Sequence, residues 1–178
     1  MHDDIQIPQF MRGKDGILKL VDFNRAEVML YDPESEEYCK YLNGPVFGNY
    51  RSPEEVNVEP LDEKIDVFSY GNNLHSVLTG LWVYYYETDD QVMQGYIEKG
   101  ELPWIDPRYR TRSFGEAFLV RLMEICWFYY PNERPSIFDV IALLKDANKR
   151  NNWLDHEQLW ESEQWMPYLD EIISVQRT

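Results

Sequence analysis

The sequence contains few cysteines, few positive charges and no long hydrophobic run. Its two cysteines, Cys39 and Cys126, are far apart and have no histidine at metal-ligand spacing, which indicates neither a disulfide framework nor a zinc site. A reducing, cytoplasmic compartment fits this pattern. The longest apolar segment, residues 78–86, is far shorter than the roughly 18 residues of a membrane-spanning helix. The charged and polar N-terminus does not resemble a signal peptide, so we expect a soluble protein without a membrane partner.

Positive charge is scarce, because 17 Lys and Arg stand against 32 Asp and Glu and give a formal net charge of −15. Such a field repels phosphate backbones and acidic lipid surfaces, so we do not expect nucleic acid as a partner. The 178 residues, 44% hydrophobic and 15% aromatic, suffice for one packed domain. Internal repeats and low-complexity tracts are absent from the sequence.

Most of the chain after residue 60 has helical periodicity. Capping and stop signals predict four helices: Asp62 to Gly80, Thr88 (with Gln91) to Gly100, Ser113 (with Glu116) to Pro131, and Ser136 to a break at Asn151-Asn152. The first is apolar nearly all round, since Val67, Tyr70 and Val77 lie outside its main apolar face. A helix of this kind is usually buried at the centre of a fold.

A β-hairpin is predicted near the N-terminus, where Asp15-Gly16 lies between two short apolar runs. This hairpin would bring Gln9 and Asp22 close together. Residues 22–54 show no sustained period and are predicted to form a long ordered loop, a type of segment that is often functional. The expected fold class is therefore mainly α with one small β-hairpin.

The last segment, residues 151–178, is acidic and aromatic. We expect it to pack on the body as one or two short helices through a set of apolar residues: Leu159, Trp160, Trp165, Leu169, Ile172 and Ile173.

Several short motifs occur in a fixed order. They are His2-Asp3-Asp4-Ile5 with Gln9, then Asp22-Phe23-Asn24, Ser52-Pro53-Glu54, Asp66 and its neighbours, Cys126-Trp127, and Arg134-Pro135. Each motif alone is common. In this order they resemble the C-terminal lobe of eukaryotic protein kinases, whose catalytic loop reads His-Arg-Asp-Leu-x-x-x-x-Asn and is followed by Asp-Phe-Gly and Ala-Pro-Glu. The resemblance covers residues 2 to about 147.

The resemblance implies a kinase C-lobe helical bundle over residues 1–150, with residues 22–54 as the activation segment. It also implies transfer of the ATP γ-phosphate to a hydroxyl of a protein substrate. Asp4 would accept the proton of that hydroxyl, and Asp22 would hold Mg2+ against the nucleotide phosphates. Gln9 stands where an Asn normally binds the second metal ion, with the same amide oxygen one methylene further out.

Four further residues match structural positions of the family. Glu54 and Arg134 would form the ion pair that fixes the activation segment to the helical body. Asp66 would hold the backbone of the catalytic loop, and His2 would be a buried structural residue. Without the order of the motifs, Asp66 is equally consistent with an acidic residue that stabilises the first turn of a helix.

One substitution bears on regulation. The Arg that usually binds a phosphorylated activation loop is Asp3 here, so a phosphate would meet repulsion instead of a partner. We therefore predict no activation by phosphorylation at the candidate sites Tyr31, Ser35, Tyr38 and Tyr41.

The hydroxyl type is not decided by the motifs. Ser/Thr kinases usually carry Lys where this chain has Gln6, and Thr where it has Phe47. Cys126-Trp127 and Arg134-Pro135 favour the tyrosine-kinase and tyrosine-kinase-like branches, whereas Tyr50-Arg51 is similar to a Ser/Thr group. We favour Ser/Thr over Tyr.

Kinase catalysis also needs a glycine-rich loop and a strand Lys, and neither motif is present in the 178 residues. We therefore expect a fragment or truncated kinase that is inactive alone, with an apolar helical face that needs the missing N-lobe or a partner protein. The substitutions at Asp3, Gln9 and Asn24 keep open a pseudokinase that acts as a non-catalytic binding module. A third reading is an acidic helical interaction domain without kinase ancestry.

Overall fold

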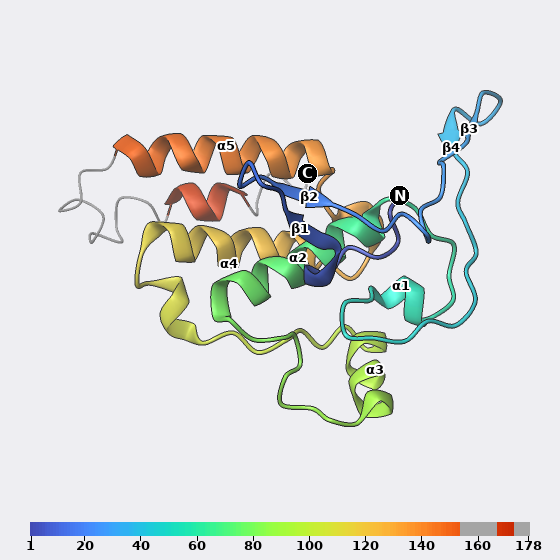
Figure 1. Cartoon of the computed structure of the whole chain (residues 1–178), viewed down its shortest axis with the longest axis horizontal. Helices are drawn as coiled ribbons and strands as arrows, with labels where there is room; N and C mark the ends of the chain where they lie inside the picture. The colour runs from blue at the N-terminus through green and yellow to red at the C-terminus, as the bar shows by residue number, and fades with distance from the viewer. Residues whose placement is uncertain (154–166, 173–178) are drawn as a thin grey trace.

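The computed structural model describes residues 1–153 and 167–172 and is mainly α-helical. Its elements are β1 (Phe10–Arg12), β2 (Leu18–Leu20), β3 (Tyr31–Asp32), β4 (Glu37–Tyr38), α1 (Pro53–Val56), α2 (Lys64–Thr79), α3 (Asp90–Glu98), α4 (Phe114–Cys126) and α5 (Ile137–Trp153). A helical turn follows at residues 167–172. The predicted fold class is confirmed. The second hairpin, β3–β4, was not predicted; it projects from the body in Figure 1.

Helices α2, α4 and α5 form the body of the molecule, and the β1–β2 hairpin is seen in front of them in Figure 1. Val120, Leu122 and Ile125 of α4 are completely buried, and α2 packs on this helix with Val67 and Phe68. The two helices approach closely at Gly71, where an added Cβ would lie 2.8 Å from the indole nitrogen of Trp127. Only glycine fits this contact without displacing the indole.

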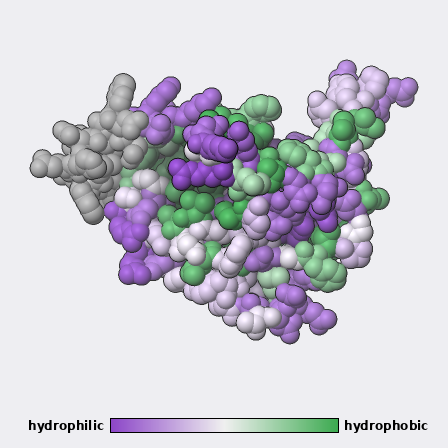
Figure 2. Space-filling view, in the orientation of Figure 1, coloured by the Kyte–Doolittle hydropathy of each residue, from purple (hydrophilic) through white to green (hydrophobic). Residues whose placement is uncertain are grey.

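The central helix is less completely buried than predicted. Val67 is inaccessible to solvent, but Val77 is 69% exposed because the last turns of α2 extend beyond the core. Exposed apolar side chains lie on the hairpin and the loop after it, at Met11, Ile17, Leu18, Phe23, Val28 and Leu30, and also on the helices, at Val77, Phe138 and Ile141. Figure 2 shows hydrophobic residues reaching the surface between strongly hydrophilic ones.

Two of the predicted helix caps are confirmed. The Ser113 hydroxyl accepts a hydrogen bond from Glu116 N at 3.3 Å, and Ser136 caps α5 in the same way through Asp139 N at 3.2 Å. The predicted Thr88 cap is wrong. Asp89 caps α3 instead, because its carboxylate accepts from two backbone N–H groups and a negative charge is favoured at a helix N-terminus.

Two predicted helix ends are also wrong. Helix α4 ends at Cys126 with Trp127 as its C-cap, before Pro131, which opens a 3-10 turn instead. Helix α5 continues through Asn151-Asn152 to Trp153. Asn is only mildly unfavourable inside a helix, and the ion pair from Arg150 to Asp146 at i,i+4 spacing supports the turns just before it.

The predicted N-terminal hairpin is confirmed. Phe10 pairs with Leu20 and Arg12 with Leu18, and Gly16 occupies the turn with φ +79°. A backbone hydrogen bond of 2.9 Å from Val21 N to Gln9 O extends the pairing. It brings the ends of both strands together, as the sequence predicts.

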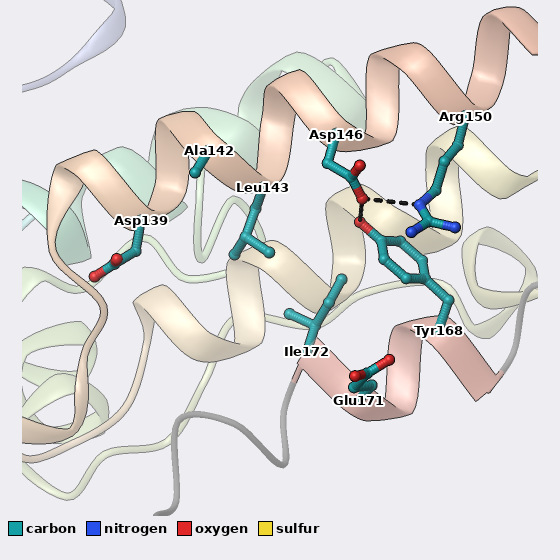
Figure 3. A pocket seen from close by; sticks show the side chains of 8 residues that line it. All are labelled: Asp139, Ala142, Leu143, Asp146, Arg150, Tyr168, Glu171 and Ile172. Carbon is teal, nitrogen blue, oxygen red and sulfur yellow. Dashed lines mark hydrogen bonds and ion pairs between the residues drawn. The ribbon is translucent and has the colours of Figure 1, made fainter.

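Residues 167–172 pack against α5 and α4 (Figure 3). The Tyr168 hydroxyl donates to Asp146 at 2.9 Å, and the guanidinium of Arg150 lies 4.1 Å from the centre of the Tyr168 ring. Leu169 and Ile172 are buried, as predicted, and Ile172 lines a cavity of about 350 Å3. The other predicted docking residues, Leu159, Trp160, Trp165 and Ile173, lie outside the described residues.

Within the described ranges, no helix combines the length and hydrophobicity needed to cross a lipid bilayer.

Candidate active site

Asp66, in the first turn of α2, fixes the backbone at the start of the chain. Its two carboxylate oxygens accept hydrogen bonds from His2 N at 2.5 Å and Asp3 N at 2.9 Å. Burial raises the pKa of the Asp66 carboxyl, and the two N–H groups partly offset this. Asp3 has φ +61°, a left-handed conformation that persists only when the surroundings hold it, and the bidentate contact from Asp66 does so.

His2 is a buried residue that joins this segment to the end of β2. Its Nε2 lies 3.1 Å from the carbonyl oxygen of Val21, and its ring meets the Phe23 ring edge to face at 4.8 Å. The structure thus places His2 as a packing residue beside Asp22.

Asp4 points toward two amide side chains of its own loop. Gln6 Nε2 lies 3.0 Å from each Asp4 oxygen, and Gln9 Nε2 donates to Asp4 Oδ2 at 2.5 Å. An ionised carboxylate can only accept hydrogen bonds, so the NH2 group of Gln9 must face Asp4. The amide oxygen of Gln9 therefore faces away from Asp4, and it makes no hydrogen bond with the residues that the structure describes.

A cation completes the surroundings of Asp4. Arg51 Nη2 donates to Asp4 Oδ1 at 3.0 Å, and both side chains are 12% exposed. Burial raises the pKa of Asp4, but the hydrogen bonds from Gln9 and Gln6 and the charge of Arg51 outweigh this and lower it. Asp4 is thus ionised at neutral pH and held by donors on several sides.

Asp22 lies two residues after the end of β2 and has φ +60°. Its carboxylate is exposed, and it makes no hydrogen bond or ion pair with the residues that the structure describes. The backbone bond from Val21 N to Gln9 O holds together the two strand ends that carry Gln9 and Asp22. A carboxylate and an amide oxygen are hard ligands of the kind that Mg2+ prefers.

These residues fit a magnesium ion that is shared with a ligand. In the described part of the chain, no group of three or more His, Cys, Asp or Glu side chains could hold a metal alone. Mg2+ usually keeps several waters and binds through one or two carboxylates together with substrate phosphates. The donor set of Asp22 and Gln9 matches that mode of binding.

The structure brings Glu54 and Arg134 together across 80 positions of sequence. Arg134 donates to both Glu54 oxygens, at 2.5 and 2.7 Å, and both side chains are almost completely buried. Arg134 also donates to the carbonyl oxygens of Phe128 and Tyr129. The pair fixes the start of α1, and with it the end of the long loop, to the helical body.

Asp3 lies in a cluster of opposite charge. Its carboxylate receives Arg25 Nη2 at 3.1 Å and Asn43 Nδ2 at 2.8 Å, and Arg51 Nη1 lies 3.6 Å away. The Asp3 side chain is 3% exposed and borders a cavity of about 280 Å3 with Arg25 and Asn43. Two cations and one amide from the loop thus converge on this carboxylate.

Comparison with models of known protein families identifies the family of this chain. The family model "protein kinase domain" matches residues 1–144. The chain belongs to the protein kinase family.

Three similar kinases are the dual specificity protein kinase shkB of Dictyostelium discoideum and the serine/threonine-protein kinases STY46 and STY17 of Arabidopsis thaliana. They are 26%, 29% and 30% identical to this chain and align with 95%, 84% and 81% of it. The kinase chain described here spans only about a quarter of their length, at 26%, 24% and 23%.

Sequence reasoning missed the cationic side of this kinase site. Arg25, Arg51 and Asn43 were not predicted as site residues, although all three contact Asp3 or Asp4. The one available signal was the i,i+4 spacing of Arg51 and Glu55, which form an ion pair at 3.1 Å. Their contacts with the catalytic-loop segment depend on how the loop closes.

Proposed function

We propose that the protein containing this chain transfers the γ-phosphate of ATP to a Ser or Thr hydroxyl of a protein substrate, with Tyr less favoured. The observation that supports the proposal is an ionised Asp4 whose carboxylate is oriented by Gln9 and Arg51, within a chain of the protein kinase family. The relatives named as serine/threonine kinases support the hydroxyl type.

In this proposal Asp4 accepts the proton of the attacking hydroxyl. The lowered pKa keeps its carboxylate ionised, and the bonds from Gln6, Gln9 and Arg51 fix its direction. These four bonds occupy the acceptor sites of the carboxylate, so the substrate hydroxyl must displace one of them. The Gln6 amide, which is shared between both oxygens, is the most easily displaced.

Asp22 and Gln9 would hold Mg2+, and ATP bound with it supplies the phosphoryl group. Asp22 offers an exposed carboxylate that has no partner among the described residues, and Gln9 offers an amide oxygen turned away from Asp4. The longer Gln9 side chain reaches further than the Asn that usually stands here, so we expect second-site metal binding to be weaker. The glycine-rich loop and strand Lys are not in these 178 residues, and we expect residues 1–178 alone to be inactive.

A non-catalytic binding role is the second candidate. It is favoured by the complete occupation of the Asp4 acceptor sites and by Asp3 and Gln9 in place of the usual residues. The two candidates differ in whether Mg2+-dependent phosphate transfer occurs.

The test uses the full-length gene product that contains residues 1–178. Mg2+–ATP affinity is measured by calorimetry for the wild type and for Asp22→Asn, and the phosphorylated substrate is analysed for phosphoserine, phosphothreonine and phosphotyrosine. We expect Asp22→Asn to weaken Mg2+–ATP binding and the product to carry phosphoserine or phosphothreonine. Wild-type protein that binds no Mg2+–ATP would favour the non-catalytic candidate.

A further inference from the structure

Arg51 lies between the catalytic-loop segment and α1, where it contacts three acidic residues. Its Nη2 donates to Asp4 at 3.0 Å, while Nη1 donates to Glu55 Oε1 at 3.1 Å and to the carbonyl oxygen of Asp3 at 2.8 Å. At 12% exposure the guanidinium is largely shielded from water. Charge interactions in such a setting are stronger than those of an exposed ion pair.

Glu55 holds Arg51 in its orientation. The Glu55 carboxylate accepts hydrogen bonds from Ser52 N and Ser52 Oγ, both at 2.8 Å, and is buried. Two contacts from Nη1 and one from Nη2 therefore set the plane of the guanidinium. The single nitrogen of a Lys ammonium cannot occupy both the Nη1 and the Nη2 positions.

The catalytic-loop segment supplies no cation of its own to Asp4. Its two side chains in contact with the carboxylate, Gln6 and Gln9, are neutral amides. Among the residues that the structure describes, Arg51 is the cation that forms an ion pair with Asp4. Arg25 pairs with Asp3 instead.

We propose that Arg51 is a positioning residue of the transfer reaction, which holds the Asp4 carboxylate in its orientation and supplies the positive charge that the loop lacks. The inference rests on the proposed function of Asp4 as proton acceptor. Arg51 directly precedes Ser52-Pro53-Glu54, so closure of the long loop onto the helical body and orientation of Asp4 depend on each other.

The test compares four forms of the full-length gene product: wild type, Arg51→Gln, Gln6→Lys and the double variant. Gln6 Nε2 lies 3.0 Å from both Asp4 oxygens, so Lys at that position can place an ammonium beside the same carboxylate. We expect Arg51→Gln to lower kcat by about 10-fold or more and to leave KM for ATP within about twofold, because it acts on Asp4 and not on the metal site. The double variant should recover much of the lost kcat.

The controls separate positioning from folding. Arg108→Gln removes an Arg that is 82% exposed and paired with Asp106, and it should leave kcat unchanged. If Arg51→Gln fails to fold, Arg51→Lys carries the test, and a lowered kcat with unchanged KM for ATP is expected. Wild-type kcat in the Arg51 variants, or a loss that Gln6→Lys does not restore, would overturn the inference. Wild-type protein that binds Mg2+–ATP but transfers no phosphate contradicts the proposed function, and this inference with it.

Discussion

The buried ion pair of Arg134 and Glu54 gives a quantitative prediction about stability. Replacing Arg134 by Met removes both bonds to Glu54 and the donors to the carbonyl oxygens of Phe128, Tyr129 and Lys64, and it leaves the Glu54 carboxylate buried without its cation. Removing one partner of a buried pair costs about 3–5 kcal/mol. We expect a loss of that size in the free energy of unfolding, a large share of the roughly 5–15 kcal/mol typical of a protein domain.

The assay is urea denaturation followed by far-UV circular dichroism, with m-values compared between variants. The double variant Arg134→Met/Glu54→Met should lose less than the sum of the two single losses, because it leaves no unpaired buried charge. Arg108→Met, at an exposed Arg, is the matched control and should shift the midpoint little. An Arg134→Met variant within about 1 kcal/mol of the wild type, at unchanged m, would refute the reasoning.

Three further predictions concern pH, positioning and regulation. Burial, partly offset by Arg51, raises the pKa of Glu55 from 4.5 to about 7, so the folded state retains a proton that the unfolded state releases. The free energy of unfolding should therefore fall by up to about 3 kcal/mol between pH 5 and 8. The measurement is the urea midpoint as a function of pH, and this midpoint should vary less with pH in Glu55→Gln. In Asp66→Asn the new amide NH2 faces one of the two backbone N–H groups that the carboxylate now binds, so one hydrogen bond is lost. Phosphotransfer in a radiolabel assay should fall by about 10-fold. Unchanged turnover would contradict the role of Asp66 in holding the catalytic-loop backbone. Glu substitutions at Tyr31, Ser35, Tyr38 and Tyr41 should not raise activity, because the nearby cations Arg25 and Arg51 are already paired with acidic side chains, and strong activation by any of them would disprove this.

Local signals predicted those features that depend on a few neighbouring residues. Gly16 identified the first hairpin because its turn needs positive φ, and Ser113 and Ser136 identified helix starts through their side-chain bonds to the backbone. The same logic failed at Thr88, where adjacent Asp89 competes for the cap with a stronger, charged acceptor. Asn151-Asn152 did not end α5, since the helix propensity of Asn is only mildly unfavourable and the Arg150–Asp146 ion pair supports the preceding turn.

Contacts between distant segments were predicted only where the order of the kinase motifs along the chain implied them. The pair Glu54–Arg134 and the placement of Asp66 came from that order. The contact of Arg51 with Asp4 spans 47 positions and depends on the path of an aperiodic loop, so no local pattern encodes it. The same holds for Asp3, where the sequence showed the charge reversal but not the two arginines that neutralise it.

The central claim is that Asp4 accepts a proton during phosphate transfer. Its most direct test is the single-turnover rate of phosphotransfer by the full-length gene product, compared between the wild type and Asp4→Asn at saturating Mg2+–ATP. The account predicts measurable transfer by the wild type and a loss of about 100-fold or more in Asp4→Asn with unchanged Mg2+–ATP affinity. Equal rates in the two proteins, or no transfer by the wild type, would contradict it.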